Sequence, residues 1–348
     1  MDSKTEKIAA FNANGVGVAN NQLFGLPFTY EESELVLFSA PWEVTVSYRA
    51  GTAKGPDAML KASTQIDLYE NDNPNGWHNG IFTKKSSATI KKKNTEVRKK
   101  AAAHIKALEK GKSVNADELI SEINTECEKM NAYVYNEATA ILADGKIPAL
   151  IGGDHSTPLG LIKALGEKHG GFGILQIDAH ADLRDAYEGF TYSHASIMFN
   201  ALQNEQVKKL VQVGVRDICD DEINLINDSN RRVVTYFNHE IKDAVFNGIN
   251  WTAICRQIVE ELPKKVYISF DIDGLDQRYC PNTGTPVPGG LAYEQAVYLL
   301  NEIITSGREI IGFDLVEVAP GDDEWDAIVG ARMLYKMCNL ALKSKTNA

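Results

Sequence analysis

Short runs of hydrophobic residues alternate along the chain with longer segments whose hydrophobic positions recur every three or four residues. The short runs are rich in Val, Ile, Leu and Phe without polar alternation, as expected for strands buried on both faces of a sheet. They predict strands over residues 35–38, 149–151, 173–177, 210–213, 233–237, 266–270 and 310–313. Among the longer segments, the spacing over residues 117–143 predicts one long helix. This alternation predicts an α/β fold, an open parallel sheet with helices on both faces.

Two regions depart from this alternation. Residues 84–112 are dense in lysine on an otherwise acidic chain. A solvated helix with a loop is the simpler interpretation of this block, and a surface for an anionic partner is the alternative. Residues 1–32 have weak periodicity and are predicted to form an arm that packs on a neighbour. Because no internal repeat and no long linker interrupts the sequence, we expect a single domain over residues 1–348.

The composition narrows the class of protein. Hydrophobic residues make up 44% of the chain and charged residues 24%, which predicts a full core and excludes disordered, collagen-like or disulfide-stapled chains. No apolar run approaches the length of a membrane span. The net charge of −11 disfavours binding to a nucleic-acid backbone. The absence of signal-peptide features and the five widely separated cysteines predict a cytoplasmic protein with reduced thiols.

Acidic residues and histidines follow three of the predicted strands. Residues 178–182 read Asp-Ala-His-Ala-Asp, residues 271–273 read Asp-Ile-Asp, and residues 152–155 read Gly-Gly-Asp-His. The carboxyl ends of parallel strands meet at one edge of a sheet, which is where open α/β sheets bind ligands. We therefore expect four carboxylates and two imidazoles to converge at this edge, namely His155, Asp178, His180, Asp182, Asp271 and Asp273.

This set of side chains predicts a site for two metal ions. Burying Asp271 beside Asp273 without cations would force one carboxylate to take up a proton. Four negative charges match two divalent cations, and such a pair supplies hydroxide near neutral pH. Oxygen and nitrogen ligands without thiolate favour Mn(II), with Ni(II), Fe(II) or Co(II) as alternatives. Asp154 and Asp276 are interpreted as groups that orient the ligands or support the fold.

Three motifs at these strand ends resemble the signatures of the ureohydrolase family, which contains arginase, agmatinase, guanidinobutyrase, formimidoylglutamase and the guanidine hydrolases. The motifs are Gly-Gly-Asp-His-Ser at 152–156, Asp-Ala-His-Ala-Asp at 178–182 and Ser-Phe-Asp-Ile-Asp-Gly-Leu-Asp at 269–276. Residues 48–56, 284–290 and 313–320 are similar to the family's early loop, the turn after its third signature and its late strand. The resemblance runs from about residue 33 to 342, in the family's order and spacing.

The resemblance implies a three-layer α/β/α fold around an eight-stranded parallel sheet. It implies two Mn(II) ions and hydrolysis of a guanidinium to urea and an amine. Asp178 and Asp271 would bridge the ions. His155 and Asp182 would complete the ligands of one ion, and His180 and Asp273 those of the other. The family also implies a homo-oligomer, either a trimer or a hexamer.

Two more residues take a role from the resemblance. Glu317 would pair with the guanidinium, because a carboxylate suits this planar cation through two parallel hydrogen bonds. The alternative is a helix cap or a surface acid. His194 would pass a proton to the leaving amine, since the pKa of imidazole lies near the working pH. The alternative is a histidine that caps the following helix. Together with Asp182, Glu317 and His194 are the predicted catalytic residues.

The segment after the second signature departs from the arginase pattern. Residues 183–192 lack the small polar set with which arginases hold the carboxylate and amine of the amino acid. Arg184, Asp185 and Glu188 are therefore predicted to contact the far end of the substrate, where either acid could attract a distal amine. Residues 84–143 also resemble no part of the family's compact core and are predicted to be a helical insertion.

These observations predict hydrolysis of a small guanidino substrate, with agmatine-like compounds first. The alternatives within this class are free guanidine, which would give urea and ammonia, and a guanidino acid such as arginine. A non-catalytic metal-binding relative and a single-zinc deacetylase of related topology are the rival classes, and a count of metals per chain would separate them. No nucleic-acid or membrane partner is expected.

Overall fold

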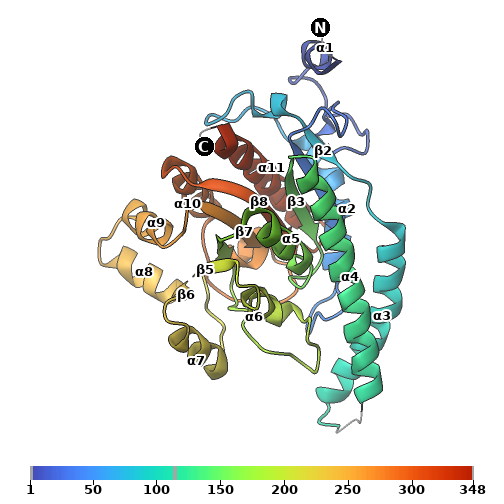
Figure 1. Ribbon diagram of the computed structural model, residues 1–348, viewed down its shortest axis with the longest axis vertical. Helices are drawn as coiled ribbons and strands as arrows, with labels where there is room; N and C mark the ends of the chain where they lie inside the picture. Colours follow the sequence, from blue (N-terminus) through green and yellow to red (C-terminus); the bar gives the residue numbers. More distant parts are fainter. Residues whose placement is uncertain (1–2, 113–115, 347–348) are drawn as a thin grey trace.

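The computed structural model describes residues 3–112 and 116–346, and Figure 1 shows how its layers are arranged. The parts of the predicted arm, insertion and domain that fall on residues 1–2, 113–115 and 347–348 lie outside the described residues. One sheet of eight parallel strands runs in the order β2-β1-β3-β8-β7-β4-β5-β6. Its strands are β1 (Leu35–Ala40), β2 (Ile81–Thr83), β3 (Ile147–Gly152), β4 (Phe172–Ile177), β5 (Val207–Val213), β6 (Val233–Tyr236), β7 (Lys265–Asp271) and β8 (Glu309–Val316). The predicted fold class is confirmed.

The helices are distributed over both faces of this sheet. They are α1 (Ser3–Ala10), α2 (Gly55–Ala62), α3 (Ala88–Leu108), α4 (Asp117–Ala143), α5 (Leu159–His169), α6 (Ile197–Leu202), α7 (Asp220–Asp228), α8 (Asn238–Phe246), α9 (Trp251–Glu260), α10 (Tyr293–Thr305) and α11 (Trp325–Thr346). Among the described residues, no helix is both long enough and apolar enough to cross a membrane.

Side chains along the strands alternate between two hydrophobic clusters, one on each face of the sheet. In β1, Leu35 and Leu37 point into the cluster that includes α2 and α8–α11, whereas Val36 and Phe38 point into the cluster that includes α3–α6. Because successive side chains of a strand point to opposite faces of the sheet, each strand contributes side chains to both clusters. Every residue of β1, β3 and β4 is buried, as the apolar runs predicted.

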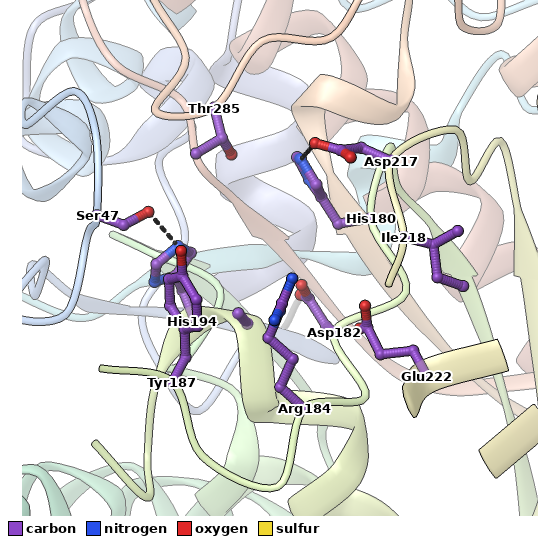
Figure 2. Close-up of a pocket in the computed structure, with 11 residues that line it drawn as sticks. Ser47, His180, Asp182, Arg184, Tyr187, His194, Asp217, Ile218, Glu222 and Thr285 are labelled. Atoms are coloured by element: carbon purple, nitrogen blue, oxygen red, sulfur yellow. Dashed lines mark hydrogen bonds and ion pairs between the residues drawn. The ribbon is translucent and has the colours of Figure 1, made fainter. Parts of the chain in front are cut away.

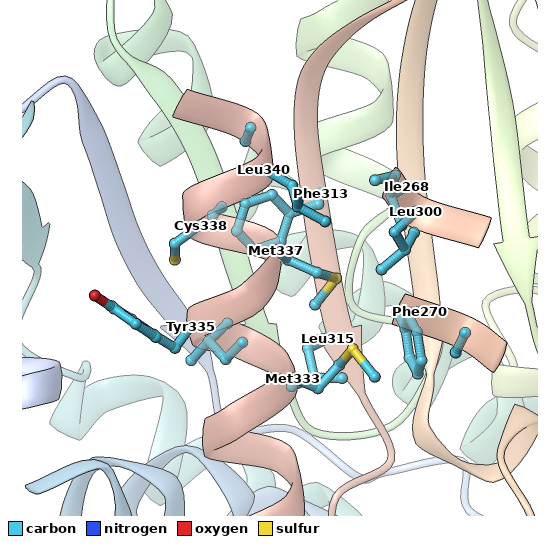
Figure 3. Close-up of a cluster of buried hydrophobic side chains, with 14 of the residues drawn as sticks. Ile268, Phe270, Leu300, Phe313, Leu315, Met333, Tyr335, Met337, Cys338 and Leu340 are labelled. Carbon is cyan, nitrogen blue, oxygen red and sulfur yellow. The ribbon is translucent and has the colours of Figure 1, made fainter. Parts of the chain in front are cut away.

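Helix α11 closes one face over the middle of the sheet. Its residues Met333 and Met337 pack in the same cluster as Phe313 and Leu315 of β8, and Figure 3 shows these side chains between the helix and the strands. The described part of the N-terminal arm packs on this same chain, since the ring of Phe24 lies 4.7 Å from that of Tyr335 on α11. This packing anchors residues that the sequence marked only as weakly periodic.

The lysine-rich segment forms helix α3, which lies along α4 at one side of the molecule (Figure 1). Its lysines pair with glutamates of α4, as in Lys100 with Glu122 at 2.5 Å and Lys93 with Glu126 at 3.7 Å. The predicted solvated helix is therefore present. The long helix predicted over residues 117–143 is α4 with the same bounds.

The sequence pattern missed one strand. Strand β2 has three residues at the edge of the sheet, which is too short to give a hydrophobic period. Helix α5 begins at Leu159, and Pro158 is its N-cap residue. Ser156 does not cap this helix, because its backbone N–H and its hydroxyl both donate to Asp154, at 3.0 and 2.5 Å.

Candidate metal centre

The register of the sheet brings the three sequence motifs together. Ile177 of β4 pairs with Phe270 of β7, so the residues that follow them, Asp178 and Asp271, emerge side by side. On the other side of β7, Asp271 pairs with Val316 of β8. Strands β3, β8, β7 and β4 are neighbours at the centre of the sheet, so their carboxyl ends form one continuous edge.

All six predicted ligands converge at this edge. Nδ1 of His155 lies 2.9 Å from carboxylate oxygens of both Asp178 and Asp182, and 3.3 Å from one of Asp271. Nδ1 of His180 lies 3.2 Å from an oxygen of Asp273 and 3.5 Å from one of Asp178. Two groups of ligand atoms result, one around His155 and one around His180, and Asp178 belongs to both.

The donors of this cluster fit divalent cations. His155 Nδ1 is buried without a hydrogen-bond partner, although it faces three carboxylates. Burial and the neighbouring carboxylates Asp273 and Asp178 raise the pKa of Asp271 well above its usual value. Burial and Asp178 raise the pKa of Asp182 to about 7. Carboxylates held so close in a buried site need positive charge to stay ionised, and a pair of cations would supply it.

A chain of hydrogen bonds fixes the ring of His155. Its Nε2 lies 2.9 Å from the hydroxyl of Ser269, which donates to Asp314 at 2.8 Å. Tyr267 also donates its hydroxyl hydrogen to Asp314. Because Nε2 is engaged in this way, Nδ1 is the nitrogen left to face the carboxylates, and outer partners of this kind are what hold metal-binding imidazoles in orientation.

Glu317 lies directly beside the ligand cluster. It follows β8, its side chain is buried, and its backbone has a φ of 62°, in the left-handed region that non-glycine residues seldom adopt. Its Oε1 accepts a hydrogen bond from the backbone N–H of His155 at 2.9 Å, while its Oε2 is buried without a hydrogen-bond partner. Burial, together with the nearby Asp154, raises the pKa of this carboxyl well above its usual range. Glu317 is therefore neither a surface acid nor a helix cap.

His194 lies across the pocket from His180, one of the predicted metal ligands (Figure 2). Its Nε2 is 3.3 Å from the hydroxyl of Ser47, and its backbone N–H donates to the hydroxyl of Thr45 at 3.1 Å. Burial, with a smaller contribution from His180, lowers the pKa of His194 to about 3, so the ring is neutral near pH 7. Ser193, not His194, caps the short 3₁₀ helix that follows.

A pocket of about 140 Å³ lies beside His180, Asp182 and His194 (Figure 2), and Glu317 is not among its lining residues. It is lined by Ser47, His180, Asp182, Arg184, Tyr187, His194, Ala195, Asp217, Ile218, Glu222 and Thr285. In Figure 2, Arg184 and Tyr187 reach toward this space from the loop after the second motif. The Arg184 guanidinium lies over the ring of Tyr187, 4.8 Å from its centroid.

The structure does not bring two of the expected substrate contacts into this pocket. The side chain of Asp185 is exposed and outside the pocket lining. Glu188 has a φ of 57°, and its carboxyl has Arg98 and Glu109, at the side of helix α3, as its charged neighbours. A short bridge between Tyr187 and Phe190 makes this turn, which carries Glu188 away from the metal cluster.

Several lining residues were not predicted from the sequence as site residues, among them Ser47, Asp217, Glu222 and Thr285. They come from loops after β1, β5 and β7 and from the first turn of α7. Asp217 follows β5 much as Asp178 follows β4, and His180 bridges to Asp217, with 4.0 Å between its Nε2 and a carboxylate oxygen. An acidic residue after a fourth predicted strand is the sequence signal that could have identified Asp217. The other three have no local pattern that would single them out.

Comparison with known proteins gives a consistent set of relatives. The sequence profile of the arginase family matches residues 33–339. An N(1)-aminopropylagmatine ureohydrolase from Thermus thermophilus is 30% identical over 311 residues, which are 89% of this chain and 91% of that protein. An agmatinase from Halalkalibacterium halodurans is 29% identical over 300 residues, covering 84% of this chain and 86% of that protein. The crystal structure of the agmatine ureohydrolase of Thermoplasma volcanium shares the fold, with a TM-score of 0.71 at 23% identity, covering 98% of this chain and 99% of that one.

Proposed function

Because the chain belongs to the arginase family and is a ureohydrolase that splits a guanidino compound into urea and an amine, we propose that its substrate is agmatine or a close analogue. The relatives that support this choice are named for agmatine and for aminopropylagmatine. The observation that carries the proposal is the pairing of a metal-ligand cluster with Glu317, whose buried Oε2 has no hydrogen-bond partner.

We propose that two divalent cations occupy the cluster, with Mn(II) ahead of Ni(II). Asp178 and Asp271 would be shared, and the ligand pairs would be His155 with Asp182 and His180 with Asp273. When bound, such cations lower the pKa of water enough to supply a nucleophile at neutral pH and polarise the group under attack. The ligand geometry described above supports this assignment.

Glu317 would bind the guanidinium of the substrate. Its Oε1 already accepts the His155 backbone hydrogen bond, and Oε2 is the acceptor that remains for a substrate N–H. The positive charge of a guanidinium would keep the carboxyl ionised in spite of its burial. A planar cation held there would present its central carbon toward the ligand cluster, because His155 contacts both.

His194 would carry the proton that the leaving amine requires. Attack of water on the guanidino carbon forms a C–O bond, and cleavage of the C–N bond then releases the amine, which must gain a proton. A neutral imidazole can accept the proton that water loses and return it to that nitrogen. The ring faces the pocket with Nε2 close to Ser47, and Asp182 lies across the same pocket (Figure 2).

The charges around the pocket support a substrate whose far end carries an amine. Asp217 has an exposed side chain at the pocket lining, whereas Glu222 is buried and its oxygens accept the backbone N–H groups of Leu183 and Cys219. Asp217 is therefore the acid free to face a distal ammonium group, while a carboxylate there would be repelled. Arg184 is the one lining cation outside the histidines among the described residues. The small volume of about 140 Å³ favours free guanidine as the second candidate.

Urea release over a panel of guanidines tests the proposal directly. The panel contains agmatine, N(1)-aminopropylagmatine, guanidine, 4-guanidinobutyrate and arginine, each with protein loaded with Mn(II) or Ni(II). Highest efficiency with agmatine or its aminopropyl analogue supports the proposal. Highest efficiency with guanidine supports the second candidate, and a preference for arginine contradicts both. Elemental analysis of the same samples counts the metals, since one ion per chain would contradict the two-metal site.

The assembly and the compartment also remain proposals. We propose a homo-oligomer, a trimer or hexamer, in the cytoplasm, by analogy with the family resemblance and from the reduced cysteines expected there. Sedimentation equilibrium of the purified protein measures the assembly, and a monomer would contradict it.

A further inference from the structure

Helix α3 presents two faces that differ in kind. Its lysines face outward and toward α4, as in the pairs with Glu122 and Glu126. On the opposite edge, Asn94 is buried, and its side-chain oxygen accepts a hydrogen bond from the backbone N–H of Glu43 at 2.7 Å. One turn later, Arg98 reaches the same segment. The helix therefore contacts the loop after β1 with polar side chains, not with its hydrophobic residues alone.

Arg98 bonds to this loop at two points. Its Nη1 donates to the backbone oxygen of Val44 at 3.1 Å and to that of Val46 at 2.6 Å. The first carbonyl belongs to the peptide unit between Val44 and Thr45 and the second to the unit between Val46 and Ser47, so one guanidinium nitrogen is bonded to the peptide unit that precedes each of these two residues. The guanidinium is half-buried, with Glu43, Asp154 and Glu188 as the acids nearest to it. Such a bidentate hold restricts the backbone more than a single hydrogen bond would.

The residues that follow the two bonded carbonyls, Thr45 and Ser47, are the ones that contact His194. Thr45 accepts the backbone N–H of His194 at 3.1 Å and donates its own hydroxyl hydrogen to Asp154 at 3.3 Å. Ser47 places its hydroxyl 3.3 Å from Nε2 of the His194 ring. The backbone and the ring of His194 are thus both tied to residues 45–47, and Figure 2 shows the Ser47 contact at the edge of the pocket.

We propose that Arg98 is a positioning residue for His194: by clamping the carbonyls of Val44 and Val46, it holds Thr45 and Ser47 where they orient the imidazole toward the pocket. The inference rests on the proposed role of His194 in proton transfer. It gives the lysine-rich helix a task in catalysis in addition to its solvated face.

A double-mutant cycle tests whether Arg98 acts through His194. Arg98→Ala is expected to lower kcat by roughly 10- to 100-fold, because small displacements of a catalytic group have effects of this size. KM and metal content should stay within about threefold of wild type, since the mutation touches neither Glu317 nor the ligands. Arg98→Lys keeps a cationic hydrogen-bond donor on a shorter side chain and should recover part of the loss. Lys99→Ala, an exposed neighbour on the same helix, is the matched control and should behave as wild type.

The decisive comparison is made in the His194→Asn background. If Arg98 acts through His194, adding Arg98→Ala there should lower kcat by less than about threefold, because coupled residues do not give multiplicative losses. Equal losses in both backgrounds would overturn the inference. If Arg98→Ala does not fold, the same cycle with Arg98→Lys decides, since that variant retains the charge.

A spectroscopic measurement separates this inference from the proposed function. The ¹⁵N resonances of the His194 ring, assigned from their loss in His194→Asn, report its tautomer and its order in the absence of any substrate. A shifted or broadened His194 signal in Arg98→Ala, with the other histidines unchanged, supports the positioning role. An unchanged His194 signal overturns it. Wild-type protein that releases no urea from any guanidine would overturn the proposed function instead, and the ring measurement would still decide the role of Arg98.

Discussion

The backbone N–H of His155 donates a hydrogen bond of 2.9 Å to Oε1 of Glu317, although 162 residues separate the two in sequence. The bond ties the proposed guanidinium-binding carboxylate to a proposed metal ligand. It arises because β3 and β8 are neighbours in the sheet, and Glu317 in turn donates its backbone N–H to Gly153 at 2.8 Å. Substrate and metals would therefore be held by one rigid piece of the fold.

Glu317→Gln should weaken productive binding of the guanidinium while leaving the metals in place. The amide keeps the size of the side chain and can still accept from His155, but it lacks the negative charge. Removing one partner of a buried charge pair costs about 2–4 kcal/mol, so kcat/KM should fall by roughly 30- to 1,000-fold. Steady-state urea release measures this loss. A matching loss of metal in elemental analysis would instead identify Glu317 as a support of the metal cluster.

Asp271→Asn should lower the number of metals bound per chain, because the proposed bridge loses a charge shared by both ions. Asp276→Asn is the control. Asp276 lies after the same strand but accepts hydrogen bonds from the side chain of Arg278, at 2.9 and 2.8 Å, and not from the ligand cluster. Metal content after dialysis against a weak chelator is the measurement. Two ions retained by Asp271→Asn would refute the bridging assignment.

His194→Asn should keep both metals and lose turnover. The residue is not a ligand, and asparagine can retain a hydrogen bond with Ser47 but cannot take up a proton. The expected fall in kcat is roughly 10²–10⁴-fold, the usual scale for a positioned acid–base group. Full activity would show that another group protonates the amine. Ser47→Ala is a milder companion variant and should give a smaller loss, because the ring itself remains.

Agmatine, or a smaller guanidine, should be hydrolysed with at least about tenfold higher efficiency than arginine, which corresponds to 1.4 kcal/mol. Asp217 would attract the distal amine of agmatine and repel the carboxylate of arginine. Asp217→Asn should accordingly raise KM for agmatine and leave KM for free guanidine unchanged, since guanidine has no far end. An equal effect on both substrates would show that Asp217 acts through its neighbour His180 and does not contact the distal amine of the substrate.

The contribution of Glu32 to stability should disappear in acid. Hydrogen bonds, first from Lys7 of α1 and then from the backbone of Thr29, lower the pKa of Glu32 from 4.5 to about 2. Because the pKa is lower in the folded state, the stabilisation is fully present above the unfolded value and is lost as the pH falls from about 4.5 through about 2. The difference in urea midpoint between wild type and Glu32→Gln, followed from pH 6 downward, should shrink over this range. A difference independent of pH would refute the assignment.

Sequence patterns were sufficient for the sheet and for the ligand cluster because both depend on local rules. A strand buried on both faces must be apolar throughout, so seven of the eight strands could be read directly, whereas β2 was too short. The acids after β4 and β7 had to converge once the strands were parallel neighbours. That expectation depends only on the rule that the carboxyl ends of neighbouring parallel strands lie at the same edge of the sheet.

The rest of the pocket depends on the paths of loops, which no period encodes. Ser47 and Thr285 reach the site from turns whose course is set by tertiary contacts, such as the hold of Arg98 on Val44 and Val46. The pocket lining includes neither Asp185, which is exposed, nor Glu188, which lies in the turn at residues 187–190 with Arg98 and Glu109 as its charged neighbours. The lysine pattern of α3 predicted the solvated face of this helix. It did not predict the contact of Arg98 with the loop after β1.

Asp182 and Glu317 both have a left-handed backbone, with φ of 55° and 62°. This conformation affects how readily the two side chains would be lost if the protein were no longer under selection. Each residue is held in a conformation that costs on the order of 1 kcal/mol for a side chain and almost nothing for glycine. Substitution to glycine at either position would relieve that strain at the same moment that it removed a proposed metal or guanidinium contact. Drift away from function would thus have part of its folding penalty offset at these two sites, although glycine at residue 317 would also leave the His155 backbone N–H without this acceptor. In a gene copy freed from selection, the identity of residues 182 and 317 would therefore be the first thing to inspect.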